Sequence, residues 1–564
     1  MSSSQPPSEQ ALAAGTKLSS LVWLMEVAGR EFVTYILNCG ENLDSILSGI
    51  TTLTPEQAAN TEILDRTLRG LPEDIDQTVR VRAALSWLSE CQANGQLTAQ
   101  MLYLNAGGQQ ISVPAADDLE ESIADLADAV YSALLLPDEF AEMFDHYNLR
   151  VGIYASRAIF DHPSASGFRE AVMNDSTLGQ LFAIEGERTG RVTKRIYLST
   201  GTAHSIQLLR LPEIILTRAW HSIPLAEQGP MQFVEAALKE LRNIRSILSR
   251  KRGITRGKIA FAGILLPEGS GLTLKGASVR STTDDDRKLA PPSLKGQASA
   301  TDFSGVTTTV SYDGDIVLEM QIPLTIRVVD GSSGNLRWPD DMHLPDEVEA
   351  TINRLRFGLI MAVEREARAL LVPTWRHFDD PLDTTMSLSW SDPREGAGFM
   401  PTQLTADEVT SWASWYERLS KPYVAKIDLA LSRILKASGE RRDPSDVLID
   451  SVIAWERLFG TKEGEPTFRI STSIAILLGE TFEERMEIKT RLSTIYGLRS
   501  KVVHGSGHLK PSEYAFCYEA LDVAIRAVRI LFLDRADILQ LPDGATRSSA
   551  LLLGARPSPD EEPP

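Results

Sequence analysis

The chain has 564 residues, of which 43% are hydrophobic and 24% charged, and its formal net charge is −19. This length exceeds one folding core, since domains average about 150 residues, and the composition excludes a largely disordered protein. The negative charge excludes nucleic-acid binding through the average surface, so an RNA contact requires a local basic patch.

The cysteines and the start of the chain indicate the cellular compartment. Cys39, Cys91 and Cys517 are far apart and show none of the paired spacings of a zinc site or a disulfide framework. MSSSQPPSEQ lacks the features of a signal peptide, and no apolar stretch approaches the roughly 18 residues that span a bilayer. We therefore expect a reduced, cytoplasmic protein without membrane contact.

The first part of the chain is predicted to be mainly helical, from residue 16 to residue 235. Residues 1–15 and 543–564 are rich in Ser, Pro and acidic side chains, so we expect two disordered tails. The clearest helix of the region follows Asp117 and Asp118. Its apolar side chains are spaced for one face, which should lie in the core: Leu119, Ile123, Leu126, Val130 and Leu134.

Residues 236–400 are predicted to form an α+β region with antiparallel strands. The segment 265–305 carries Gly, Ser, Pro and three consecutive Asp residues, which indicates a long loop. Strict alternation over 316–328, after the turn signal Asp-Gly, predicts a strand, in which Pro323 favours an edge or a bulge. A helix is expected over 346–371, with apolar residues on one face.

Residues 401–542 are predicted to form a bundle of four or five helices. One helix should begin with Asp443 as its cap and Pro444 in its first turn, and an earlier helix should kink at Pro422. The expected fold class is therefore a multidomain α+β protein: a helical amino-terminal region, a middle region with a β-sheet, and an all-α carboxy-terminal bundle.

Within the bundle, the helix over 481–505 carries the residues that chemistry would need. Its apolar stripe is narrow and includes Arg499, although a guanidinium in such a seam is costly unless it is paired or faces a cleft or a second subunit. The stripe consists of Ile488, Leu492, Ile495 and Val502.

His504 follows Arg499 by five positions, about 140° round a helix, so the two do not share a face, whereas Ser500 and His504 do. Arg499 and His504 can meet through a long reach by the arginine, through a distorted helix end, or through a second copy of the helix. We favour the second copy, which predicts a composite site in a homodimer.

The surroundings of His504 favour a role with phosphate. Gly505 is a natural helix stop, so the imidazole should lie at the negative end of the helix dipole, which suits an acid or base near neutral pH. No acidic residue occurs between Ile488 and Ser512, which leaves a basic island of Lys489, Arg491, Arg499, Lys501 and Lys510. Spacing alone is not specific, because Arg157 to His162 and Arg337 to His343 match it too.

Three segments together resemble a known superfamily: AWERLFG, SIAILLG and YGLRSKVVHG, within residues 440–540. They are similar to the HEPN superfamily, and most similar to its Apea-like branch. The resemblance implies a dimer of helical bundles whose Arg-x4-6-His motif lines a cleft. The motif residues would be Arg499, its polar neighbour Ser500 and His504, and Glu456 would position the arginine.

The resemblance further implies a metal-independent endoribonuclease without cofactors, of the kind found in phage-defence or toxin systems. His504 would act as base or acid in transesterification, and Arg499 would stabilise charge on the phosphorane. The RNA would also contact Lys489, Arg491, Lys501 and Lys510. The alternative is a non-catalytic HEPN module that binds RNA or a partner protein, and a third reading of the helix is purely structural.

Two further groups were weighed as sites. Residues 241–258 hold seven basic residues and no acidic one, which indicates a solvated helix end or, less strongly, an RNA guide. His377, Asp379 and Asp380 are a weak candidate for a metal site, since adjacent carboxylates point in different directions. We therefore expect no metal.

Overall fold

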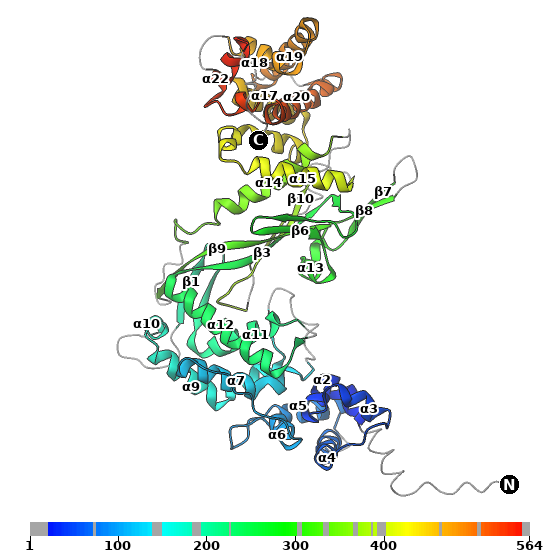
Figure 1. Ribbon diagram of the computed structural model, residues 1–564, viewed down its shortest axis with the longest axis vertical. Helices are drawn as coiled ribbons and strands as arrows, with labels where there is room; N and C mark the ends of the chain where they lie inside the picture. Colours follow the sequence, from blue (N-terminus) through cyan, green and yellow to red (C-terminus); the bar gives the residue numbers. More distant parts are fainter. Residues whose placement is uncertain are drawn as a thin grey trace, which may run out of the picture. The chain divides into compact units, whose positions relative to one another are not determined.

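The structure is a computed structural model of mixed α and β type (Figure 1). The residues that it describes are 21–70, 75–137, 149–182, 193–224, 227–301, 307–330, 338–364, 370–384, 387–391, 402–461, 465–504 and 509–554. The predicted tail 1–15 lies outside these residues. Two compact units divide the chain, and each is described below by itself.

Both units are assembled from separated segments of the chain. The first unit consists of Met1–Thr255, Pro323–His343 and Asp379–Ser387, and the second of Arg256–Ile322, Leu344–Phe378 and Leu388–Pro564. The sequence predicted contiguous regions instead. The difference arises because the long strands β3 (Arg252–Ala262) and β9 (Ile316–Asp330) each contribute residues to both units.

The first unit contains two apolar cores. The core nearer the amino terminus is built from Leu21–Leu102 together with Leu136 and Tyr154. Its helices are α2 (Arg30–Ile36), α3 (Leu43–Leu47), α4 (Pro55–Arg69), α5 (Gln77–Leu88) and α6 (Thr98–Asn105), with the short 3-10 turn η1 (Gly40–Asn42). Helix α4 begins with a capping box between Thr54 and Gln57, which satisfies two free backbone donors.

The second core of this unit surrounds α7 (Asp118–Leu134), and here the sequence prediction is confirmed. Asp117 caps the helix through the Glu120 amide, and all five residues of the predicted apolar face are buried. Around α7 lie α8 (Ile153–Asp161), α9 (Pro163–Asn174), α10 (Leu178–Phe182), β1 (Thr193–Leu198), β2 (Ala203–Gln207), η3 (Leu208–Arg210), α11 (Leu211–Ser222) and α12 (Pro230–Arg250).

The predicted strand over 316–328 is confirmed as β9, whose alternate residues from Ile316 to Ile326 are buried. Its first half pairs antiparallel with β6 (Ala277–Ser281) as far as Met320, and its second half pairs with β1 from Ile326 onward. On its other side β9 pairs with β3, so this strand lies inside the sheet and the edge position that Pro323 favoured is wrong. Pro323 instead lies between the β6 and β1 ladders. Its missing amide therefore removes no bond from either of them, which explains how a proline is tolerated in this strand.

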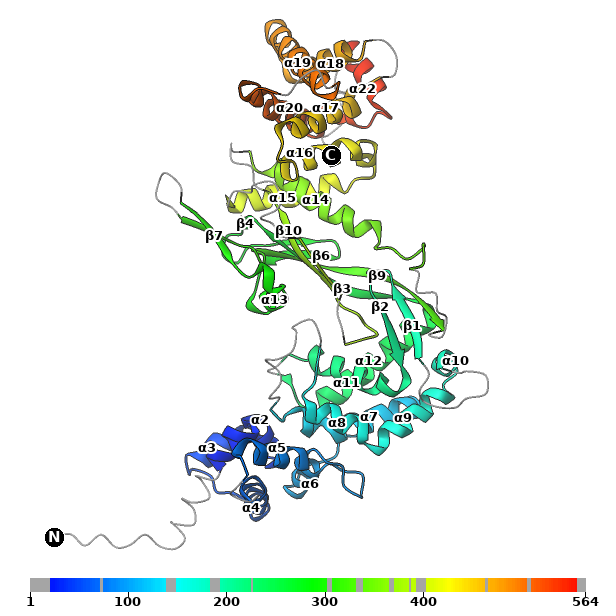
Figure 2. The ribbon, with the colours of Figure 1, turned by 180° about the vertical axis from the view of Figure 1, so that it is seen from behind.

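The segment 265–305 differs from the predicted long loop. It contains β5 (Leu272–Leu274), β6, the short helix α13 (Asp284–Lys288), η5 (Pro292–Leu294) and β7 (Gln297–Thr301), which pairs with β8 (Thr307–Ser311) (Figure 2). The three-aspartate run begins α13 rather than a loop. Asp286 is fully buried, where it accepts bonds from Lys258 and Arg280.

The helices of the second unit share one core with its sheet. Helix α14 (Asp346–Ala362) ends nine residues before the predicted end, and its apolar face is buried as expected. The other elements are β4 (Ile264–Leu265), β10 (Val372–Phe378), β11 (Ser387–Trp390), β12 (Thr402–Gln403), α15 (Ala406–Leu419), η6 (Pro422–Ile427), α16 (Asp428–Gly439), α17 (Pro444–Phe459), α18 (Pro466–Leu478), α19 (Phe482–Val503), η7 (Pro511–Glu513), α20 (Tyr514–Leu533), α21 (Ala536–Leu539) and α22 (Gly544–Leu552).

The start of the bundle follows the sequence closely. Asp443 caps α17 and Pro444 occupies its first position, as predicted. Pro422 begins the 3-10 turn η6 after α15 has ended at Leu419, so the predicted kink is a break between two helices.

The tail predicted over 543–564 is wrong for its first part, because α22 is folded against α17 and α18 (Figure 1). Asp543 caps this helix, and the Arg547 guanidinium donates to the carbonyls of Leu458, Arg457 and Leu541. Buried Ser548 and Ser473 share a hydrogen bond. The composition of residues 543–564 predicted a disordered tail because these contacts are made with residues that are distant in the sequence.

Candidate anion-binding site around Arg499

Helix α19 carries the motif residues and is held by few of its own side chains. A capping box between Thr481 and Glu484 begins it, but only Leu492 and Ile495 are fully buried. Ile488 and Val502 are partly buried, so the predicted stripe is present but narrow. The rest of this helix is largely exposed, which leaves Arg499 at the edge of the only face that packs.

Arg499 lies against α17, where Glu456 receives it. The Arg499 Nη2 atom is 3.5 Å from Glu456 Oε1, and the two side chains are 22% and 29% exposed. The Tyr496 hydroxyl donates to the same carboxylate oxygen at 2.6 Å. Burial and then the Glu456 carboxylate raise the pKa of Tyr496 well above its usual range, so the phenol stays protonated and serves as a donor.

The contact with Glu456 does not satisfy the guanidinium. Arg499 Nε is buried and has no hydrogen-bond partner among the described residues. The guanidinium carbon lies 6.0 Å from the centre of the Tyr496 ring. A buried donor without a partner is costly, and a ligand or water that accepts from Nε would remove that cost.

Among the described residues, the side chains of His504 and Ser500 show no hydrogen bond or ion pair with Arg499 or Glu456. Helix α19 ends at Val503, and the His504 amide donates to the Ser500 carbonyl as a C-terminal cap. His504 and Val503 are exposed. No contact between His504 and Arg499 is seen among the described residues, and the composite site of two chains stays a prediction. Gly505 lies outside the described residues.

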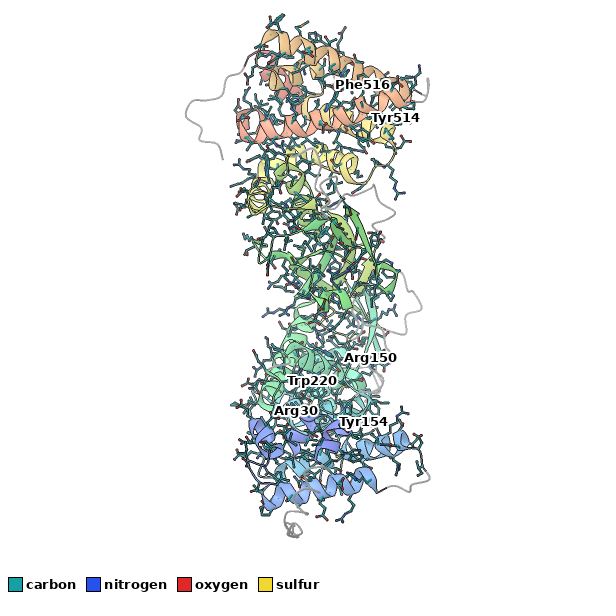
Figure 3. The ribbon with its side chains drawn as sticks, turned by 90° about the vertical axis from the view of Figure 1, so that its right-hand side faces the viewer. Arg30, Arg150, Tyr154, Trp220, Tyr514 and Phe516 are labelled. Atoms are coloured by element: carbon teal, nitrogen blue, oxygen red, sulfur yellow. The ribbon has the colours of Figure 1, made fainter. Side chains whose placement is uncertain are left out.

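The basic island is largely compensated in three dimensions. Arg491 makes a bidentate contact with Glu519, whose nearer pair of atoms is 2.6 Å apart, and its guanidinium carbon lies 4.0 Å from the centre of the Phe516 ring. Figure 3 labels Phe516 on the bundle. Lys501 lies 3.4 Å from Glu513. These two acids follow the window in which the sequence shows none, so the expectation of an uncompensated island fails for Arg491 and Lys501.

Lys510 and Lys489 are the other two residues that were predicted to contact RNA. Lys510 is exposed, and its backbone amide bonds to Glu513. The Lys489 ammonium lies 4.5 Å from the centre of the Phe468 ring, which is itself about half exposed. A cation over an aromatic face keeps its charge available to a ligand.

A cavity of about 1120 Å³ opens beside Arg499 within the second unit. Its described walls come from η6, α16, α17, α18, α19 and the start of α22, and they include Glu456, Tyr496 and Arg499. Four further basic residues line it: Lys426, Arg433, Arg457 and Arg547. His504, Ser500 and the four predicted RNA-contacting residues are not among the described lining residues.

Sequence reasoning missed these four cations because nothing in their local sequence groups them. Arg457 directly follows Glu456 in AWERLFG, and this adjacency was the one available signal. The others are joined to it only by the folding of η6, α16 and α22 around the end of α17. Tertiary packing, rather than a linear motif, builds the surroundings of Arg499.

The basic stretch 241–258, which the sequence offered as an RNA guide, forms ion pairs with acidic side chains. In the stretch 241–258, Arg242 binds both oxygens of Glu120, and Arg245 binds Asp117. Lys258 at the end of the stretch binds Asp286. At least three of the seven basic side chains therefore have acidic partners, which weakens the reading as an RNA guide.

Asp379 and Asp380, the carboxylates of the weak candidate for a metal site, are in contact with basic side chains of the protein. Asp379 accepts two bonds from the buried guanidinium of Arg218, and Asp380 Oδ2 lies 3.1 Å from His204 Nδ1. His377 is buried in β10. Across the described ranges, no group of three or more His, Cys, Asp or Glu residues is arranged to hold a metal ion.

Helices of the described ranges are all too short or too polar to cross a membrane. Comparison of the chain with family models, with curated proteins and with solved structures finds no match. The likeness to the HEPN superfamily therefore rests on the residues quoted from the sequence.

Proposed function

We propose that the carboxy-terminal bundle is a HEPN-type, metal-independent endoribonuclease that acts as a homodimer and serves as an effector in phage defence or a toxin system. The observation that carries the proposal is the state of Arg499. Its guanidinium lines a cavity, is held from one side by Glu456, and keeps a buried Nε without a partner among the described residues. This arrangement suits a group that receives a phosphate oxygen.

The position of His504 is the reason for the second chain. In one chain the imidazole stands at the exposed end of α19, while Arg499 faces α17. A partner that presents its His504 at the mouth of the Arg499 cavity completes the site. His504 then takes the proton of the ribose 2′-hydroxyl or returns one to the leaving 5′-oxygen, and Arg499 stabilises the phosphorane.

The exposed face of α19 supports an approach by a second helix. Gly497 lies on this face, and a Cβ atom added there would meet nothing within 4 Å. Met486, eleven residues earlier and so on nearly the same side of the helix, is 46% exposed, and a second helix could cover it.

One assay tests the activity. Purified protein is incubated with mixed single-stranded RNA in EDTA, beside the His504→Ala and Arg499→Ala variants, and cleavage by wild type alone is expected. Each variant should lose at least about a hundredfold in rate, the usual contribution of an acid/base group or a charge-stabilising donor. Equal cleavage by all three proteins would refute the assignment.

The second candidate is a non-catalytic module that binds RNA or a partner protein through the same cavity. The compensation of Arg491 and Lys501 by Glu519 and Glu513 favours it, because these two basic residues then offer less free charge to a reacting phosphate. Saturable RNA binding without cleavage, in wild type that is shown to be dimeric, would support this candidate.

A further inference from the structure

A second cavity of the second unit, of about 430 Å³, lies between α14, the end of α15, η6 and α16. We call it the α14 cavity. Figure 2 shows α14, α15 and α16 lying together in this unit. Its volume is within the roughly 300–1000 Å³ usual for small-molecule sites, so it has room for a small organic ligand.

The α14 cavity is separate from the Arg499 cavity, because α16 stands between them. Ala430 and Arg433 line the Arg499 cavity, whereas Leu431 and Leu435 line the α14 cavity. These two pairs of residues point about 150° apart round the helix. None of the residues proposed for RNA cleavage is among the described lining residues of the α14 cavity.

Apolar side chains form the floor of the α14 cavity. They come from all four walls, and each is at most 9% exposed: Phe357, Leu419, Val424, Leu431 and Leu435. Small side chains also line the cavity, namely Ala350 on α14, Ala425 on η6 and Ser432 on α16, and their size leaves space above the floor. Protein interiors are close-packed, so a space of this size over an apolar floor favours a ligand with an apolar body.

Two of the charged residues on the rim already have partners. Glu349 binds Arg376 of β10, and Arg354 donates to Glu347 at 2.9 Å. Each pair joins one acidic and one basic side chain, so these four residues add no net charge to the rim.

Three other charged residues of the rim are exposed: Asp346, Lys421 and Asp428. Asp346 and Asp428 are the first residues of α14 and α16, and Lys421 directly precedes η6. No ion pair of these three side chains is seen among the described residues. The rim therefore offers two carboxylates to a cationic group and one ammonium to an anionic group.

The floor and the rim together define the chemistry of a fitting ligand. An inorganic ion would leave the floor uncovered, and a hydrocarbon would leave the three charged side chains without partners. A molecule with an ammonium group, a carboxylate and an apolar body matches all parts of the cavity.

We infer that the α14 cavity binds a small zwitterion with an apolar body, that is, an apolar amino acid or a short apolar peptide. Its ammonium group is received by Asp346 and Asp428, its carboxylate by Lys421, and its apolar body lies on the floor. The inference concerns a ligand other than RNA and needs no second chain, and so goes beyond the proposed function.

Titration calorimetry on the full chain tests the inference, with L-phenylalanine, L-leucine and the dipeptide L-leucyl-L-phenylalanine as probes. Three partial ligands accompany them: phenethylamine lacks the carboxylate, 3-phenylpropionate lacks the ammonium group, and glycine lacks the apolar body. At least one probe should bind at least tenfold more tightly than every partial ligand, and the tighter of amino acid and dipeptide identifies the source. Absence of binding by all three probes overturns the inference, as does a partial ligand that binds equally tightly.

Two substitutions of aspartate form a matched pair for the same measurement. Asp428 and Asp446 are both exposed acids in the first turn of a helix, but only Asp428 is among the described lining residues of the α14 cavity. Asp428→Asn should weaken binding of the tightest probe about tenfold or more, as expected for the loss of a bond to a charged group, and Asp446→Asn should not change it. Equal weakening by both variants would indicate general attraction by charge and overturn the inference.

Two further variants locate the ligand. Ala350→Leu fills part of the α14 cavity without changing its charges, so it should weaken binding at least tenfold, and unchanged binding would overturn the inference. Arg499→Ala should bind the probe like wild type, because Arg499 is not among the described lining residues, although the proposed RNA cleavage is lost. Binding of a probe by a wild type that cleaves no RNA would leave the inference standing and remove only the proposed function.

Discussion

The most informative single substitution for the fold is Arg547→Ala. The Arg547 side chain is 1% exposed, and its guanidinium donates at 2.8, 3.1 and 3.1 Å to the carbonyls of Leu458, Leu541 and Arg457. Burial lowers the pKa of Arg547, opposed by the charge of Asp543, and the three hydrogen bonds help to offset the cost of burial. The substitution leaves three carbonyls without their donor and a void beside them.

The expected cost follows from the bonds. Hydrogen bonds that involve a charged group contribute about 1.5–3 kcal/mol each, and because one guanidinium makes all three we expect about 3 kcal/mol in total. We expect α22 to exchange through local opening, so this cost should appear as a roughly 150-fold loss of amide protection there. Hydrogen exchange of the full chain, read by mass spectrometry over residues 544–554, measures it.

Two controls make the result specific. Peptides from α7 in the first unit should exchange as in wild type, and Arg547→Lys should show a smaller loss because an ammonium keeps the charge with fewer donors. Unchanged protection of α22 in Arg547→Ala would refute the idea that this guanidinium holds the helix. It would also remove the support for α22 as a wall of the Arg499 cavity.

Three other predictions concern charge. Burial alone would lower the pKa of His204, but Asp380 raises it above its usual value. The ion pair of His204 and Asp380 therefore stabilises the first unit at low pH, and this stabilisation is lost as pH rises through the folded pKa. His204→Gln should lower the melting temperature more at about pH 5.5 than at about pH 8.5. Burial would raise the pKa of Asp286, but Arg280 and Lys258 hold it well below its usual range. Asp286→Asn should therefore lower the free energy of unfolding in urea by about 3 kcal/mol near neutral pH, and this difference should shrink below about pH 4. An equal cost at every pH would contradict the ion pairs. If RNA binds the bundle, Lys510→Ala should reduce the slope of log affinity against log salt by about 0.7, while Arg491→Ala, already paired with Glu519, should change it less; the opposite order would show that the pairing is broken in the complex.

The parts of the fold that the sequence predicted are those with strong local patterns. The cap and apolar face of α7, the alternation of β9 and the cap of α17 each lie within one element, so spacing alone reveals them. The 140° angle between Arg499 and His504 is likewise a property of one helix.

Features that depend on distant contacts were not predictable. The Gly-rich and polar residues around β5 indicated a loop. This strand has only three residues, and its pairing with β6, which the local sequence does not reveal, stabilises it. The basic island was judged inside a window, whereas its partners Glu513 and Glu519 stand just beyond it. Arg547 and the carbonyls that it binds are up to 90 residues apart in sequence.

The candidate site shows the same division. Arg499 and Glu456 were expected to meet, and their side chains are in contact, although the proposed roles in catalysis remain predictions. Lys426, Arg433 and Arg457 join Arg499 only because η6, α16 and α17 surround one cavity.

The central claim is a site assembled from Arg499 of one chain and His504 of another, and a mixed dimer tests it most directly. Arg499→Ala and His504→Ala chains with different tags are co-expressed, and the heterodimer is isolated. One of its two composite sites is then intact, so RNA cleavage in EDTA should return to about half the wild-type rate, although each homodimer is inactive. A stable heterodimer that stays as inactive as its parents would contradict the claim.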